Sequence, residues 1–161
     1  MHIVIDGYNV IGTLHNDIEK AREGLIDLLI KYKKFKEHDI TVVFDAYKQG
    51  GKYEHSSFRG GVRIIYTRLG ETADDVIKMM ISGLRREWII VTSDRDIIKY
   101  AWSMNSIPVP SDVFLDILLN HPNEEALIED MKDTEELRPQ RGSSYRLSKK
   151  DRAVKRVLSK L

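Results

Sequence analysis

Cysteine is absent from this sequence of 161 residues. Its absence excludes disulfides, thiolate metal sites and cysteine nucleophiles. No apolar run approaches the roughly 20 residues that a membrane-spanning helix needs. Asp6 interrupts the first apolar run and no small-residue cleavage site follows it, so we expect no secretory signal. These absences favour a cytoplasmic protein that does not contact a membrane.

The common cofactor motifs are missing as well. The sequence contains neither a Gly-rich dinucleotide fingerprint nor a P-loop. The histidines do not have the spacing of metal ligands; they are His2, His15, His38, His55 and His121. A functional site therefore has to be built from other residue types.

What the sequence does contain is a series of apolar strand-like runs that end in carboxylates. HIVID ends at Asp6, TVVFD at Asp45 and WIIVTSD at Asp94, while Asp74 and Asp75 open an amphipathic segment between them. Strands that are apolar almost throughout belong in a sheet covered on both faces, where ligands collect at the carboxyl ends of the strands. Several acids are therefore expected at one rim, and their repulsion favours a hard cation such as Mg²⁺ or Mn²⁺.

Strands and helices are predicted to alternate along the chain. The predicted strands are 2–6, 41–44, 62–67, 88–92 and 107–109, and the predicted helices are 17–35, 72–86, 94–104 and 112–119. Alternation of this kind indicates βαβ crossovers and an α/β fold, a three-layer α/β/α sandwich with a mainly parallel sheet. The Gly-rich segment 47–61 is predicted to be a mobile loop.

The charges suggest two parts, a compact domain over residues 1–122 and a charged C-terminal extension over residues 123–161. Seven acids and one lysine lie in 124–136, and nine Lys or Arg and one Asp lie in 138–160. A basic tail, with a predicted short helix over 147–161, is a plausible contact for nucleic-acid phosphates. A solvated helix whose charges serve solubility explains the pattern equally well. The oligomeric state, monomer or homodimer, stays open.

Two of the acidic motifs have a structural explanation besides a chemical one. Thr72 with Asp75, and Ser93 with Asp96, have capping-box spacing, so these acids can satisfy helix-end amides. Asn9 could orient Asp6 or a bound water, or could be an ordinary turn residue. The candidate catalytic and metal-binding residues are therefore Asp6, Asp74 and Asp94, with Asp45, Asp75 and Asp96 as outer members.

The predicted chemistry follows from the rim. If the strand order has a switch point between the first and fourth strands, Asp6 and Asp94 lie on neighbouring strands about 5 Å apart and can reach one ion. Such an ion lowers the pKa of a bound water and neutralises charge on a phosphoryl oxygen, as phosphodiester hydrolysis requires. The alternatives are a catalytically idle RNA- or ribosome-binding module and a phosphatase acting on small phosphoesters.

The motifs IDGYN, VVFDA, ETADD and VTSDRD, in this order, resemble the NYN branch of the PIN-like nucleases, specifically the bacterial YacP-like group. The resemblance covers roughly residues 1–120 and extends more loosely to the basic tail. It implies a PIN-like fold, a metal-binding acidic pocket and endoribonuclease activity that leaves a 3′-hydroxyl and a 5′-phosphate. The positions that match are Asp6, Asp74 and Asp94 for the pocket, Asn9 and Ser93 for its polar neighbours, and Asp45 for a more variable acid.

Some members of the YacP-like group act on messenger RNA at the ribosome, so the resemblance implies mRNA and ribosomes as partners. Tyr47, Tyr53 and Phe58 could stack on unpaired bases, or could be incidental aromatics of a surface loop. The predicted RNA contacts are Lys48, Lys52, His55 and Arg59 in the loop and Lys149, Lys150, Arg152, Lys155 and Arg156 in the tail, with Arg63, Arg68 and Arg95 as further candidates.

Overall fold

The computed structural model describes residues 1–12, 17–45, 55–83, 87–120 and 148–161. Its centre is a six-stranded sheet with the strand order β3-β4-β2-β1-β5-β6. The strands are β1 (His2–Asp6), β2 (Asp39–Phe44), β3 (His55–Arg59), β4 (Val62–Tyr66), β5 (Trp88–Val91) and β6 (Ile107–Val109). All neighbouring strands are parallel except β3 and β4, so the predicted mainly parallel sheet is confirmed.

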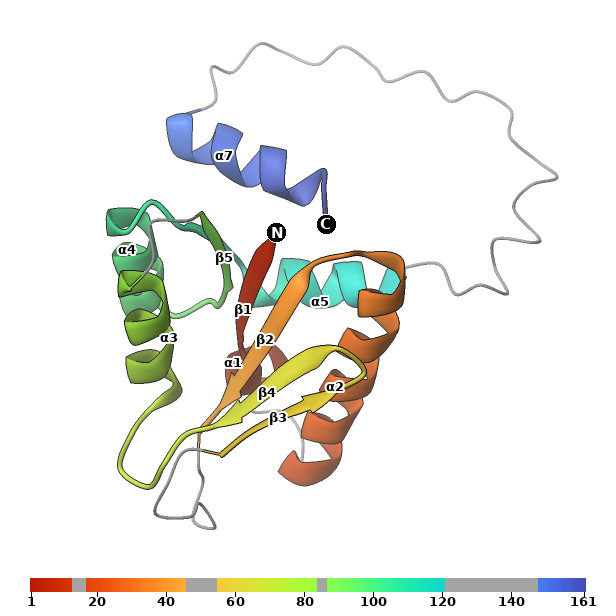
Figure 1. Ribbon diagram of the computed structural model, residues 1–161. Coiled ribbons are helices and arrows are strands. Elements are labelled where there is room, and N and C mark those ends of the chain that lie inside the picture. The colour runs from red at the N-terminus through yellow and green to blue at the C-terminus, as the bar shows by residue number, and fades with distance from the viewer. Residues whose placement is uncertain (13–16, 46–54, 84–86, 121–147) are drawn as a thin grey trace, which may run out of the picture.

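Helices cover both faces of this sheet. They are α1 (Gly7–Ile11), α2 (Ile18–Phe35), α3 (Ala73–Ser82), α4 (Arg95–Ser103), α5 (Ser111–Asn120) and α7 (Lys149–Leu158). In the part of the chain that the structure describes, none of them is long and apolar enough to cross a membrane. Helices α3 and α4 lie on one side of the sheet, and α2 and α5 lie on the other (Figure 1).

Two apolar cores explain this layering, because alternate side chains of a strand point to opposite faces. Ile3 and Ile5 of β1 pack into the larger core with α1, α2 and α5, whereas Val4 packs into the smaller core with α3 and α4. All three side chains are fully buried. The predicted three-layer α/β/α sandwich is therefore confirmed.

The strand order places the switch point where the sequence predicts it. Strand β1 pairs with β2 on one side and with β5 on the other, both in parallel register. The carboxyl ends of these three strands therefore meet at one edge of the sheet. Asp6 ends β1 and Asp94 lies just after β5, so the two residues lie at the ends of neighbouring strands, as predicted.

The prediction of a loop over 47–61 is wrong for its second half. Residues 55–59 form β3, which pairs antiparallel with β4. The connecting residues Gly60 and Gly61 have φ values of 54° and 82°, a left-handed conformation that suits a two-residue hairpin turn. The strand escaped prediction because HSSFR is an exposed edge with few β-branched or aromatic residues. Residues 46–54 lie outside the described residues.

After β1 the structure contains a short helix, α1, which includes Asn9, so Asn9 does not lie in an ordinary turn. Gly7 opens this helix, and its φ does not lie in the left-handed region. A Cβ atom at Gly7 would clash with the buried ring of Phe44. The glycine is therefore needed for space rather than for an unusual backbone angle, and it lets α1 start directly above β2.

The predicted C-terminal helix forms as α7, and it packs against the larger core. Val157 and Leu161 are buried there, and the Tyr32 hydroxyl donates a hydrogen bond of 2.9 Å to the Leu161 carbonyl. The predicted boundary at residue 122 lies outside the described residues and stays a prediction. The basic end of the chain is nevertheless held to the fold by buried apolar contacts.

Candidate active site

Asp6 is the central acid of the rim. It ends β1 and caps α1, accepting hydrogen bonds of 3.3 Å from the Asn9 backbone N–H and 3.3 Å from the Thr92 hydroxyl. Burial, together with the smaller effect of the charges of Asp45 and Asp94, raises the pKa of Asp6 from 3.8 to about 6, although the two hydrogen bonds act to lower it. Asp6 is therefore a desolvated carboxylate that faces two others across the ends of three adjacent strands.

Asp45 connects the rim to α3. It follows β2 directly and accepts a 2.5 Å hydrogen bond from the backbone N–H of Ala73, the first residue of α3. A carboxylate at a helix N-terminus is stabilised by the unpaired amides and the helix dipole. This contact holds the first turn of α3, which carries Asp74, against the end of β2.

Asp74 has two unlike carboxylate oxygens. Its Oδ2 accepts a 2.9 Å hydrogen bond from Lys78 Nζ, one helical turn further along. Its Oδ1 is buried and has no hydrogen-bond partner. An unpaired buried carboxylate oxygen is costly in a folded protein, and a bound cation would remove that cost.

Asp94 caps α4, and this differs from the prediction. Its Oδ1 accepts hydrogen bonds of 2.7 Å from the Asp96 N–H and 3.2 Å from the Ile97 N–H. The predicted capping box between Ser93 and Asp96 is therefore wrong. Aspartate caps as well as serine does, and Ser93 is engaged elsewhere. The negative charge of Asp94 acts on Asp6 and also raises the pKa of Lys78.

A polar cluster of Asn9, Ser93 and Ser111 supports the rim from the α5 side. Asn9 Oδ1 accepts hydrogen bonds of 2.8 Å from the Ser93 N–H and 2.5 Å from the Ser111 hydroxyl, while the Ser111 N–H donates a 3.1 Å bond to Ser93 Oγ. Of the two expectations for Asn9, the local backbone contact is the one observed: Asn9 touches Asp6 through its backbone N–H and not through its side-chain amide. Its side chain joins α1 to the starts of α4 and α5.

The outer acids serve different purposes. Asp75 forms the predicted capping box with Thr72, whose hydroxyl donates a 2.8 Å bond to it, and these bonds lower the pKa of Asp75. Its role is the start of α3. Asp96 lies in the first turn of α4, where its charge contributes to raising the pKa of Lys78. The ammonium group of Lys78 thus interacts with Asp74 of α3 and with Asp94 and Asp96 at the start of α4.

Sequence reasoning missed Thr92, Ser111 and Lys78. Thr92 is fully buried, and its hydroxyl both donates to Asp6 and accepts a 3.1 Å bond from the Asp94 N–H. Its place between a strand and an acid in VTSD was an available signal. Lys78 follows Asp74 at the i,i+4 spacing of helical ion pairs, which the sequence also displays. Ser111 had no comparable signal, because its contact depends on how α5 packs.

The predicted RNA contacts of the loop segment are only partly described. Lys48, Lys52, Tyr47 and Tyr53 lie outside the described residues. His55 and Phe58 are exposed on β3, Phe58 at 72%. RNA contact by these side chains stays a prediction.

Several of the predicted arginine contacts already have partners in the fold. Arg59 forms a 2.7 Å ion pair with Glu23 of α2. Arg68 and Glu71 form a 3.5 Å ion pair, and Arg63 Nε donates a 3.1 Å hydrogen bond to the Ser56 hydroxyl. Arg95 is exposed at the start of α4, next to Asp94. Of the predicted arginines outside the tail, Arg95 therefore lies closest in the chain to the acidic rim.

The oxygen donors of the rim suit a hard divalent ion, and the unpaired Asp74 Oδ1 is consistent with one. Across residues 1–12, 17–45, 55–83, 87–120 and 148–161, however, no three histidine, aspartate or glutamate side chains are gathered closely enough to hold a metal ion. The carboxylates of Asp6, Asp74 and Asp94 thus share one rim without forming a finished ligand set. Their assignment as metal ligands stays a prediction.

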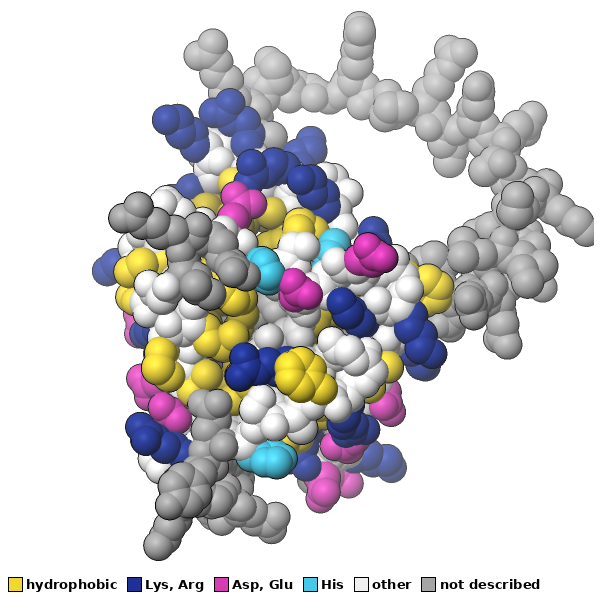
Figure 2. Space-filling model, in the orientation of Figure 1, with side chains coloured by type: hydrophobic (Ala, Val, Ile, Leu, Met, Phe, Trp, Pro, Cys, Tyr) yellow, Lys and Arg dark blue, Asp and Glu magenta, His cyan; other side chains and the backbone are white. Residues whose placement is uncertain are grey.

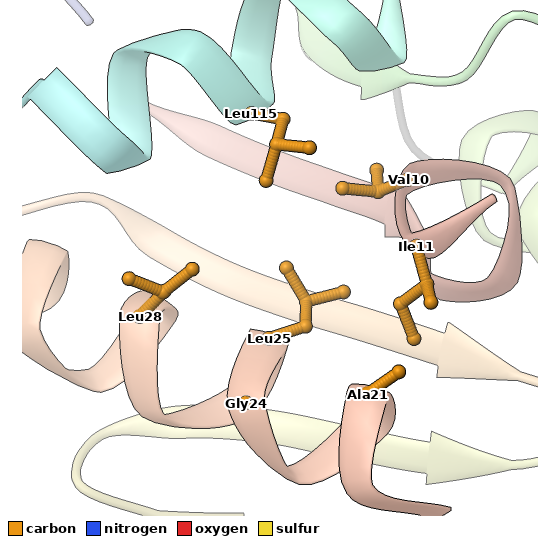
Figure 3. A pocket seen from close by; sticks show the side chains of 7 residues that line it. All are labelled: Val10, Ile11, Ala21, Gly24, Leu25, Leu28 and Leu115. Atoms are coloured by element: carbon orange, nitrogen blue, oxygen red, sulfur yellow. The ribbon is translucent and has the colours of Figure 1, made fainter. Parts of the chain in front are cut away.

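A cavity of about 230 Å³ lies between α1, α2 and α5, and none of the rim acids lines it (Figure 3). Figure 3 shows aliphatic side chains pointing into it. Such a lining has no group that can hold a cation or a phosphate, so the rim is the candidate active site. The lining residues are Val10, Ile11, Ala21, Gly24, Leu25, Leu28 and Leu115.

Comparisons with known proteins agree with this fold and motif set. A family model described as the YacP-like NYN domain matches residues 3–158. A curated Bacillus subtilis (strain 168) relative, named uncharacterized protein YacP, is 33% identical over 89 residues, which are 51% of this chain and 52% of that protein. The chain thus spans about half the length of the curated relative it matches.

Two crystal structures of Rae1 (YacP) from Bacillus subtilis are similar to the chain. One, of a mutant, has a TM-score of 0.62 at 20% identity, covering 85% of this chain and 86% of that one. The other has a TM-score of 0.62 at 24% identity, covering 81% and 79%. At these identities the structures show a shared fold.

Proposed function

The chain belongs to the YacP-like NYN domain family, a nuclease family, and from this we propose that it is an endoribonuclease that hydrolyses RNA phosphodiester bonds with Mg²⁺ or Mn²⁺. The observation that carries the proposal is the acidic rim. The ends of β1, β2 and β5 and the start of α3 bring Asp6, Asp45, Asp94 and Asp74 to one edge of the sheet.

In this proposal Asp6, Asp74 and Asp94 would hold the ion after a small rearrangement of their side chains. The bound ion would lower the pKa of a water and neutralise charge on the phosphoryl oxygens. Thr92 keeps Asp6 and the start of α4 in place through its two hydrogen bonds. Lys78 donates a hydrogen bond to Asp74 Oδ2, so it would share Asp74 with the ion, and its ammonium group would help to neutralise the charge of the phosphodiester.

The electrostatics of Asp6 support cation binding. Its raised pKa means that the folded protein holds an uncompensated negative charge there at neutral pH. A divalent ion relieves the repulsion among the carboxylates, so the folded state gains stability when the ion binds. Asp45 adds to the negative potential at the rim, although its main role is structural, because it accepts a hydrogen bond from the first turn of α3.

The substrate and setting that we propose follow the resemblance of the motifs. They are messenger RNA as substrate, the ribosome as partner and the cytoplasm as location. The guanidinium group of Arg95 at the start of α4, next to Asp94, is the described group best placed to meet a single strand at the rim. On β3, His55 pairs with Tyr66 at the carboxyl end of β4, whereas the exposed Phe58 pairs with Arg63 nearer the amino end and lies further from the rim.

Two aspartates at helix starts provide a matched test. Asp94 and Asp75 both accept hydrogen bonds from helix-end amides or hydroxyls, and asparagine retains that ability without the charge. With Mn²⁺, Asp94→Asn is expected to lower cleavage of an end-labelled RNA by about 100-fold. Asp75→Asn is expected to change it by less than about twofold, because Asp75 serves the capping box.

The same assay separates the other readings. Equal cleavage by wild type and both variants, or cleavage that survives EDTA, would point to a contaminating nuclease. RNA binding without cleavage in either metal, with ribosomes also supplied, would establish an idle binding module. Hydrolysis of a small phosphoester without RNA cleavage would establish a phosphatase.

A further inference from the structure

Helix α7 presents a basic surface at the edge of the sheet opposite to the acidic rim. It lies across the amino ends of the strands: Arg156 forms a 2.8 Å ion pair with Glu87, which precedes β5, and the His38 ring, just before β2, lies 3.3 Å from the Lys160 carbonyl oxygen. Figure 1 shows α7 beside the start of β1. The rim lies at the other end of the same strands.

The helix is fixed in this position by its apolar side. Val157 and Leu161 are 2% and 7% exposed, and Leu161 accepts the hydrogen bond from the Tyr32 hydroxyl. The Lys150 ammonium group lies 5.2 Å from the centre of the Trp102 ring, which holds the first turn against α4. The outward face of α7 is therefore a defined surface on the fold.

That outward face is strongly positive. From Lys149 to Lys160 there are six Lys or Arg and a single acid, Asp151. Arg156 pairs with Glu87 and Lys150 lies on the Trp102 ring, which leaves four exposed cations for that face: Lys149, Arg152, Lys155 and Lys160. Asp151 is committed to the capping box with Ser148 at the start of the helix. The Lys and Arg side chains are exposed, and Figure 2 shows them as a dark blue group over α7.

The residue types favour a phosphate backbone as the ligand. Helix α7 contains no aromatic residue, so its outward face offers no platform for stacking on unpaired bases. Lysine and arginine at successive turns are suited to phosphates, which base-paired RNA displays in a regular array regardless of sequence. The face thus fits base-paired RNA better than a single strand.

We propose that the outward face of α7 is a second RNA-binding surface, which holds the backbone of a base-paired RNA segment while cleavage takes place at the acidic rim. The proposal rests on the proposed nuclease function. Strand β1 has 5 residues and separates the two edges by roughly 16 Å. The RNA that uses both surfaces is therefore folded RNA, with the cut in a segment away from the held helix.

The test measures binding apart from cleavage. In EDTA, the affinity for an RNA duplex of about 16 base pairs is followed by fluorescence anisotropy across a salt series. Arg152→Gln/Lys155→Gln is expected to weaken binding about tenfold and to reduce the slope of log affinity against log salt by about 2. The control, Lys20→Gln/Lys31→Gln, removes the same charge from exposed positions of α2 and is expected to change both much less.

The outcomes distinguish this proposal from the proposed function. Cleavage of a short single-stranded RNA by wild type with Mn²⁺ is measured separately and reports the proposed catalytic function alone. Unchanged duplex affinity and salt slope in that variant, or a loss equal to the control's, would overturn the α7 surface whatever the cleavage result. Loss of duplex binding alongside an inactive wild type would support the surface and reject the catalytic function. Binding of acidic peptides or anionic vesicles through α7, without duplex binding, would overturn the assignment to RNA.

Discussion

Replacing Asp6 by asparagine is expected to abolish metal-dependent cleavage and to make the folded protein more stable at neutral pH. In the proposed site Asp6 is a ligand of the ion, and losing its charge costs on the order of 10³-fold in rate. The same charge is desolvated, with a pKa raised to about 6. Removing this charge therefore removes an electrostatic cost to the folded state. The wild-type protein keeps that cost because the same charge is needed to bind the ion.

The pH dependence follows from the direction of the shift. The carboxyl of Asp6 has a pKa of about 6 in the folded protein against 3.8 in its ordinary state, so the folded protein binds the proton more tightly. The charge of Asp6 lowers the free energy of unfolding. This loss of stability is absent below pH 4, grows between pH 4 and 6, and reaches its full size above pH 6. At roughly 1.4 kcal/mol per pKa unit, its upper limit is about 3 kcal/mol.

Chemical denaturation of wild type and Asp6→Asn at several pH values measures this directly. The free energy of unfolding of Asp6→Asn is expected to exceed that of wild type by about 2 kcal/mol at pH 7.5, and the difference is expected to vanish near pH 4. Added Mn²⁺ is expected to stabilise wild type and not the variant. A variant that is less stable at every pH, or that still cleaves RNA, would contradict this account of Asp6.

Of the substitutions proposed for this protein, Val157→Asp is expected to lower the free energy of unfolding most. Val157 is 2% exposed and belongs to the same core as β1, α2 and α5. A carboxylate there would be buried without a partner, so the free energy of unfolding is expected to fall by about 4 kcal/mol. That is a large share of the roughly 5–15 kcal/mol that stabilises an ordinary domain.

The matched control for this prediction is Arg152→Asp in the middle of the same helix. Arg152 is exposed, so the change is expected to alter the free energy of unfolding by about 0.5 kcal/mol or less. Denaturation followed by circular dichroism reports both values. Equal, small effects of the two substitutions would mean that α7 is not part of the folded core.

The layered fold could be predicted from the sequence because its strands are short apolar runs bounded by helical patterns. The expectation of a switch point between the first and fourth predicted strands was also right, and it puts Asp6 and Asp94 at the ends of adjacent strands, β1 and β5. Strand β3 was missed because its residues are polar, although the Gly60-Gly61 pair is a hairpin signal. The contact between α7 and the larger core could not be predicted, because the few apolar residues of α7 do not indicate which surface of the fold they pack against.

The site was predictable in its residue types and less so in its contacts. Capping-box spacing was right for Thr72 and Asp75 but wrong for Ser93, because the packing of α5 places Ser111 and Asn9 against it. Tertiary contacts of this kind decide which of two adjacent polar residues caps a helix. The burial that raises the pKa of Asp6 also depends on the assembled fold.

A crystal structure of the protein soaked in Mn²⁺, with anomalous scattering used to locate the metal, tests the central claim most directly. The account predicts a manganese ion at the rim, within about 2.5 Å of carboxylate oxygens of Asp6 and Asp94, with Asp74 turned toward it. A rim without metal at millimolar Mn²⁺, or an ion bound elsewhere without Asp6, would contradict it.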